Sequence, residues 1–177
     1  KGSFKLGIIP TIATYLVPVL LHKHQTTCNE IELTLKESTT SNLIKDILTG
    51  TLDGGVLAGP INHSGLLEYP VYYEKFYAYV SPLEDVYKEK EINLDEIDIR
   101  TVWLLENEHC LRGQIERLCQ LKKKSSVEGA YSIKYESGSI DTLTHVVDYN
   151  PGLTIIPEMH AMGLSEEKQE NLRASRI

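Results

Sequence analysis

Long apolar runs are missing from this sequence, and cysteine is scarce. No stretch approaches the 18 consecutive apolar residues that predict a transmembrane helix, and the amino terminus lacks the apolar core of a signal peptide. Three cysteines in 177 residues are too few, and odd in number, for a secreted domain held together by disulfides. These absences favour a cytoplasmic protein with no membrane partner, in which a disulfide is transient, catalytic or sensory.

The sequence also has no excess of positive charge. Lysine and arginine number 18 against 25 aspartate and glutamate, which gives a formal net charge of -7 and a pI of about 5.4. The lysines are dispersed except at residues 122–124, which close a predicted helix, where cations stabilise the free carbonyls. This part of the protein therefore lacks the basic face that binds nucleic acid.

What the sequence does contain is an alternation of short strands and helices. Apolar residues make up 41% of the chain and charged residues 24%, as in globular α/β proteins. In the first part, residues 4–8, 31–36 and 56–58 are predicted strands. One helix is predicted from Pro10, and a second follows capping side chains at residues 39–42 and ends at Gly50.

The alternation continues after an extended run at residues 67–80, which is long enough to pass from one domain into another. A polar connector at 82–99 precedes a predicted strand at 101–105 and a helix at 110–124. Further predictions are a strand at 132–135, a helix that begins at the cap Ser139 and ends before Pro151, a strand at 153–156, and a loose polar segment at 165–171.

This order predicts an α/β fold of two Rossmann-like lobes, residues 1–79 and 80–177, with parallel sheets and a cleft between them. In such folds ligands bind at the carboxyl ends of strands, where helices begin. Three segments lie at such positions: Pro10-Thr11, Thr39-Thr40-Ser41 and His109-Cys110.

Two cysteines, Cys110 and Cys119, lie nine residues apart within a predicted helix. Leu111, Ile115 and Leu118 recur there at helical spacing. Nine residues of α-helix span about 13.5 Å, whereas a disulfide needs Cα atoms roughly 4.4–6.8 Å apart. The pair cannot bond while the helix stands, so a bond would make the segment a conformational switch with oxidation as its input.

Residues 104–112, Leu-Leu-Glu-Asn-Glu-His-Cys-Leu-Arg, followed by Cys119, resemble the peroxide-sensing loop of the OxyR family of LysR-type transcription regulators. The His-Cys-Leu-Arg run with its second cysteine is specific to these sensors. Matches shared by LysR-type regulatory domains in general extend the resemblance over most of the chain, at residues 7–11, 15–16, 50–53, 139–143 and 152–157.

The resemblance implies a regulatory domain with the fold of LysR effector domains and type 2 periplasmic-binding proteins. A DNA-binding winged helix-turn-helix would precede Lys1, and a return of the chain beyond Ile177 would complete the first lobe. The implied protein is no enzyme and needs no cofactor. It is a bacterial homodimer or homotetramer that senses hydrogen peroxide, binds promoter DNA through the absent domain, engages RNA polymerase, activates antioxidant genes, and is reset by thiol reductants.

By the same resemblance, Cys110 is the peroxidatic cysteine, whose thiolate becomes a sulfenic acid, and Cys119 is the resolving cysteine that condenses with it. His109 and Arg112 lie beside the reacting sulfur, and the helix amino terminus also favours the thiolate. Thr11 and Thr40 match positions that bind the peroxide. Gly113 departs from the pattern, because many family members carry an acidic residue there.

Other interpretations stay open for several of these residues. Thr11 and Thr40 are also typical helix caps, and His109 is equally typical of capping or packing. Adjacent His109 and Cys110 lack metal-ligand spacing, so no metal is expected, and neither a cysteine hydrolase nor a thiol peroxidase is favoured. The alternative function is a small-molecule effector domain or solute-binding protein that holds a metabolite at Thr11, Thr40 and Ser139.

Overall fold

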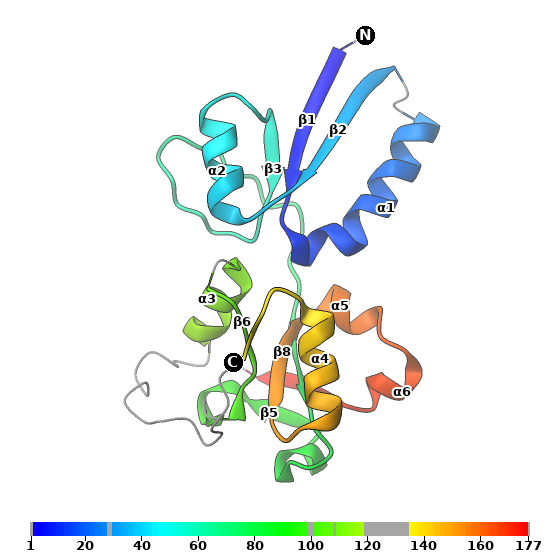
Figure 1. Ribbon diagram of the computed structural model, residues 1–177, viewed down its shortest axis with the longest axis vertical. Helices are drawn as coiled ribbons and strands as arrows, with labels where there is room; N and C mark the ends of the chain where they lie inside the picture. The colour runs from blue at the N-terminus through cyan, green and yellow to red at the C-terminus, as the bar shows by residue number, and fades with distance from the viewer. Residues whose placement is uncertain (1, 28–29, 99–100, 108, 119–134, 177) are drawn as a thin grey trace. The chain divides into compact units, whose positions relative to one another are not determined.

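The computed structural model describes residues 2–27, 30–98, 101–107, 109–118 and 135–176, and the chain forms two compact units, Lys1–Tyr72 and Tyr73–Ile177 (Figure 1). The division lies before strand β4 (Phe76–Val80), whereas the sequence placed it at residues 79 and 80. The physical reason is pairing: β4 is hydrogen-bonded to two strands of the second unit, so it belongs to that unit's sheet.

The first unit is a parallel three-stranded sheet with two helices. Its elements are β1 (Gly2–Ile8), α1 (Pro10–Thr27), β2 (Ile31–Glu37), α2 (Thr40–Leu48) and β3 (Gly54–Val56), and the strand order is β2-β1-β3. Figure 1 shows α1 beside β2 and α2 beside β3. The parallel pairing confirms the prediction for this unit. Strand β3 begins earlier than predicted, because its pairing with β1 runs from Gly54 to Val56.

Helix α2 packs directly on the central strand of this sheet. Leu43 of α2 is fully buried, and Gly7 of β1 lies beneath it. A Cβ at position 7 would come within 2.6 Å of Leu43 Cδ2 and 2.8 Å of Leu52 Cδ1, so a glycine is required for this close approach. Gly50 follows the helix with φ 70°, the left-handed conformation that glycine adopts at helix ends.

The second unit is a mixed α/β structure. Besides β4 it contains β5 (Glu91–Asn93), β6 (Leu104–Leu105), α3 (Cys110–Leu118), β7 (Glu136–Ser137), α4 (Ile140–Tyr149), β8 (Leu153–Pro157), α5 (Glu158–Met162), α6 (Glu166–Gln169) and β9 (Leu172–Arg176). One sheet has the order β5-β9-β4-β8, and β6 pairs in parallel with β7. The α/β class is confirmed, but the expectation of purely parallel sheets is wrong here, because β4 runs antiparallel to both β8 and β9.

Several short elements were not predicted. The connector at 82–99 contains β5 and two 3-10 turns, η1 (Asp85–Lys88) and η2 (Leu94–Glu96), and the segment expected to be loose contains α6. Strand β9 is polar, and its strand conformation depends on pairing with β4 and β5, which no local pattern reveals. The predicted strand at 132–135 lies mostly outside the described residues, and β7 follows it.

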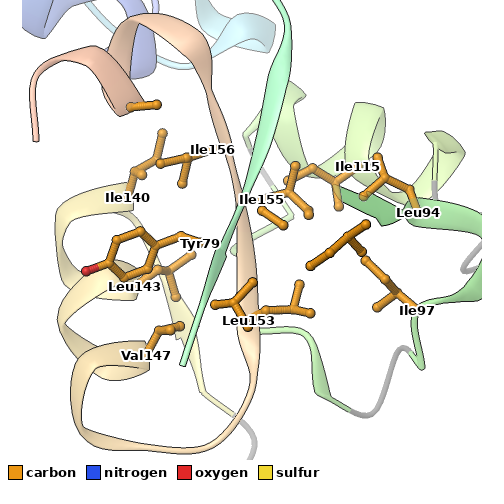
Figure 2. Close-up of a cluster of buried hydrophobic side chains, with 14 of the residues drawn as sticks. Tyr79, Leu94, Ile97, Ile115, Ile140, Leu143, Val147, Leu153, Ile155 and Ile156 are labelled. Carbon is orange, nitrogen blue, oxygen red and sulfur yellow. The ribbon is translucent and has the colours of Figure 1, made fainter. Parts of the chain in front are cut away.

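The core of the second unit covers both sides of its sheet. Strand β8 is buried along its whole length and is apolar except at Thr154, whose hydroxyl donates to the Trp103 carbonyl at 2.9 Å. Figure 2 shows side chains of α4 on one side of β8, and side chains of η2, its flank and α3 on the other. The labelled residues on the two sides are Ile140, Leu143 and Val147, and Leu94, Ile97 and Ile115. Because Ile115 belongs to this core, it holds α3 against the sheet.

A polar network within this unit is centred on Tyr79 of β4, whose side chain is fully buried. The Tyr79 hydroxyl donates to the Asp148 carboxylate and accepts from Asn171 Nδ2 at 3.2 Å. Asp148 also pairs with Lys168 Nζ at 2.8 Å. Burial, with the hydrogen bond to Asp148, raises the pKa of Tyr79 above its ordinary value, so the phenol stays protonated. The network joins α4, α6 and the start of β9 to the central strand.

We expect Tyr79→Phe to lower the free energy of unfolding by about 1–3 kcal/mol, because Asp148 and Asn171 lose a buried partner. The measurement is urea denaturation, with Tyr149→Phe as the control, since Tyr149 is 82% exposed. Because the pKa of Tyr79 is raised in the folded state, the difference in unfolding free energy between the wild type and Tyr79→Phe depends on pH. This difference is complete below about pH 10, the ordinary tyrosine pKa, and declines above it. Equal stability of both variants would contradict this account.

Candidate functional site

The sheet of the first unit brings Thr11 and Thr40 to one edge. Strands β1 and β2 run in parallel with Ile8 opposite Glu37, so both end at the same edge, and a helix begins after each. Thr11 is the second residue of α1, and Thr40 is the first residue of α2. Both are half-buried. Both residues therefore lie just after the ends of strands, as the sequence predicted.

The hydroxyl of Thr40 has an unusual environment. Its Oγ1 is buried and makes no hydrogen bond within the part of the chain that the structure describes. The cap residue of α2 is Thr39, and its side chain makes no capping hydrogen bond, so the predicted side-chain cap is not formed there. A buried hydroxyl without a partner is costly and uncommon in proteins.

The second unit places Cys110 in an equivalent position. Cys110 follows β6, is the first residue of α3, and is half-buried with a free thiol. Strand β7 lies parallel to β6 with Ser137 opposite Leu105, and α4 begins just after it. Ser139 caps α4 as predicted, because its side chain accepts from the Thr142 amide. The amino terminus of a helix favours an anion such as a thiolate.

His109 is almost covered by the surrounding protein. Its side chain is 9% exposed, and its Nε2 lies 3.7 Å from Oε1 of Glu106. A turn links the two residues, since the His109 amide donates to the Glu106 carbonyl at 3.2 Å. Sequence reasoning overlooked Glu106, although a carboxylate three residues before a histidine in a turn is a usable signal. The structure thus adds an acidic side chain to the surroundings of His109.

Arg112 connects α3 to the two short strands. Its Nη1 donates to the Leu105 carbonyl at 2.8 Å and to Glu136 Oε1 at 2.7 Å, and its Nε donates to Glu116 Oε1 at 3.0 Å. Burial alone would lower the pKa of Arg112, but the hydrogen bonds and charges of the two glutamates outweigh it and raise the pKa. Within the described residues its hydrogen bonds go to these three groups and none to Cys110, so the contacts favour an anchoring role.

Helix α3 is docked along its length. Leu111 and Ile115 are 3% and 1% exposed, and Leu118 packs against the same core. The predicted helix is therefore confirmed from Cys110 to Leu118. The resolving cysteine of the prediction, Cys119, lies outside the described residues, as do Cys28 and the lysines at 122–124.

The described residues contain no group of three or more histidine, cysteine, aspartate or glutamate side chains arranged to hold a metal ion. Among them, no helix combines the length and apolar character needed to cross a membrane.

Family models and individual relatives indicate the same kind of protein. The family model of the LysR substrate-binding domain matches residues 1–172. A hydrogen peroxide-inducible genes activator of Haemophilus influenzae is 25% identical over 167 residues, which are 94% of this chain and 54% of that protein. The regulator EstR of Acinetobacter baylyi is 30% identical over 158 residues, 89% of this chain and 50% of that protein. The chain thus spans about half the length of these relatives.

A solved structure of a similar protein has the same fold as this chain. A crystal structure of OxyR from Porphyromonas gingivalis is 29% identical and aligns with a TM-score of 0.84. The alignment covers 98% of this chain and 77% of that structure.

We expect Arg112→Ala to lower the free energy of unfolding of the second unit by about 1–3 kcal/mol, because hydrogen bonds to charged groups are worth roughly that amount. The control is Lys88→Ala, whose ion pair with Asp85 is 3.8 Å long and joins fully exposed side chains, so no change is expected. Urea denaturation measures both. An unaltered stability of Arg112→Ala would mean that the three hydrogen bonds do not hold α3.

Proposed function

The chain belongs to the LysR substrate-binding domain family, and we propose that it is the regulatory domain of a transcription regulator that senses hydrogen peroxide through Cys110. The observation that carries the proposal is the free, half-buried thiol of Cys110 at the first residue of α3, directly after His109. The similarity to a peroxide-inducible activator and to OxyR supports it.

In the first step, the Cys110 thiolate attacks one oxygen of hydrogen peroxide. The S–O bond forms and the O–O bond breaks, and the sulfur becomes a sulfenic acid. The second oxygen leaves as hydroxide and takes a proton from His109 to become water. Thr11 and Thr40 supply hydroxyl groups that bind the peroxide. The buried Thr40 hydroxyl, which has no partner within the described residues, supports this assignment.

In the second step, the thiol of Cys119 attacks the sulfenic sulfur, a disulfide forms and water is released. Helix α3 separates Cys110 from Leu118 by eight residue steps, a rise of about 12 Å, so the proposed disulfide would require α3 to unwind. Unwinding exposes Leu111 and Ile115, each worth about 1.5–3 kcal/mol of burial, and breaks the hydrogen bonds of Arg112. A disulfide formed against this resistance is easily reduced, which lets cytoplasmic thiol reductants reset it.

The refolded segment would then change how regulatory domains pair in a homodimer or homotetramer. Such a change would alter the spacing of the DNA-binding domains of the whole protein on promoter DNA, and with it the contact with RNA polymerase at antioxidant genes. The protein is expected to act in the bacterial cytoplasm.

The alternative is an effector domain that binds a metabolite instead of reacting with peroxide. The similarity to EstR favours it, and so does the edge formed by Thr11 and Thr40, which suits an ordinary polar ligand. It differs from the first proposal in one respect: it needs no reactive cysteine.

Mass spectrometry of the reduced chain after one equivalent of hydrogen peroxide tests the proposal. We expect a rapid disulfide between Cys110 and Cys119 in the wild type. A persistent sulfenic acid is expected in Cys119→Ser and no oxidation product of this kind in Cys110→Ser, since the two cysteines have different roles. Cys28→Ser is the matched control and should behave as the wild type. Slow oxidation distributed over all three cysteines would instead favour the metabolite-binding alternative.

Replacement of Thr40 by valine separates a role in binding from a role in folding. The hydroxyl has no partner to lose within the described residues, so Thr40→Val should leave the free energy of unfolding unchanged or slightly higher. The rate of Cys110 oxidation should fall roughly tenfold, the equivalent of one hydrogen bond to the peroxide. Thr34→Val, at an exposed position of β2, is the control. An unchanged oxidation rate would remove Thr40 from the site.

A further inference from the structure

Both backbone groups of Glu106, the amide and the carbonyl, make hydrogen bonds. The Glu106 amide donates to the Ser137 carbonyl at 3.0 Å, a bond that belongs to the parallel pairing of Leu105 with Ser137. The Glu106 carbonyl accepts from the amide of His109, and the His109 carbonyl in turn accepts from the amide of Arg112 at 3.1 Å. The turn between β6 and α3 therefore holds the Glu106 and His109 backbones in a defined relation.

The side chains of the two residues meet on this turn. Glu106 Oε1 lies 3.7 Å from His109 Nε2, and the exposed fractions are 50% for the Glu106 side chain and 9% for that of His109. A nearly buried imidazole has little freedom to turn. The Glu106 carboxylate lies beside Nε2 and can therefore fix the orientation of the ring, as carboxylates do for histidines at other reactive sites.

Gly138 supplies the space in which the carboxylate lies. A Cβ at position 138 would be 2.7 Å from Glu106 Oε1 and 3.9 Å from His109 Nε2. An alanine there would collide with the end of a flexible side chain and not with backbone, so the carboxylate would move while the fold stayed intact. Position 138, on a second segment of the chain, thus limits where the Glu106 carboxylate can lie relative to His109.

We propose that Glu106 is a positioning residue for His109 and that Gly138 keeps open the space in which the two meet. The inference rests on the peroxide-sensing function proposed above and adds two residues to it. Glu106 does not touch the peroxide. It holds the imidazole so that His109 protonates the departing hydroxide as the Cys110 S–O bond forms, after which His109 regains a proton from solvent.

The test measures the second-order rate of Cys110 sulfenic acid formation with hydrogen peroxide between pH 5 and 9, with Cys119→Ser in every protein. We expect Glu106→Gln and Gly138→Ala each to lower this rate about tenfold and to change its pH profile in the same way. The double variant should lose no more than either single variant, because both substitutions remove the same contact.

Two controls match these substitutions. Gly113→Ala adds the same methyl group within α3, where nothing lies within 4 Å of the new Cβ, and Glu166→Gln removes an exposed carboxylate of α6. Neither should change the rate or its pH profile. Urea denaturation of all variants accompanies the kinetics, so that a loss of rate with an unchanged pH profile and a lower stability reveals a merely structural role.

The outcomes distinguish this inference from the proposed function. If the chain with Glu106 and Gly138 intact does not react with peroxide, the sensing function itself is wrong. If it reacts and the two variants match it in rate and pH profile, or lose rate additively, the positioning role is wrong and the sensing function stands.

Discussion

The docking of α3 on the second unit is the constraint on which the proposed chemistry depends. Leu111 and Ile115 bury one face of the helix in the core, and Arg112 ties it to β6 and β7. These contacts hold Cys110 at the amino terminus of α3. In the proposed mechanism the same contacts oppose the disulfide, because its formation needs the helix to unwind. One set of interactions would therefore position the thiol for the first oxidation step and resist the second.

The surroundings of the His109 imidazole come from two chain segments. Glu106, His109 and Cys110 lie on the segment that joins β6 to α3, and Gly138 lies after β7 and leaves room for the Glu106 carboxylate. The parallel pairing of β6 with β7 brings these segments to one edge, as β1 and β2 do for Thr11 and Thr40 in the first unit. Both units thus use the same device, in which parallel strands end together and helices begin.

Local patterns predicted the first unit better than the second. Strands β1 and β2 and the helices after them follow clear periodicities, and the cap Ser139 and the buried strand β8 were also evident. Local sequence patterns did not predict elements whose structure depends on pairing with strands distant in sequence. Strand β9 is a short, mostly polar run that becomes a strand only beside β4 and β5. Strand β4 was assigned to the wrong unit because its partners lie 73 to 97 residues away in sequence.

The sequence by itself determined the α/β class, the family resemblance, and the helical segment that begins at Cys110, because these depend on local periodicity and on short motifs. Tertiary structure alone decided which side chains meet. The bond of Arg112 to Glu136 beside β6, the burial of the Thr40 hydroxyl without a partner among the described residues, and the space that Gly138 leaves for the Glu106 carboxylate all depend on contacts between segments. Such contacts follow from strand pairing and core packing, and no spacing along one chain segment encodes them.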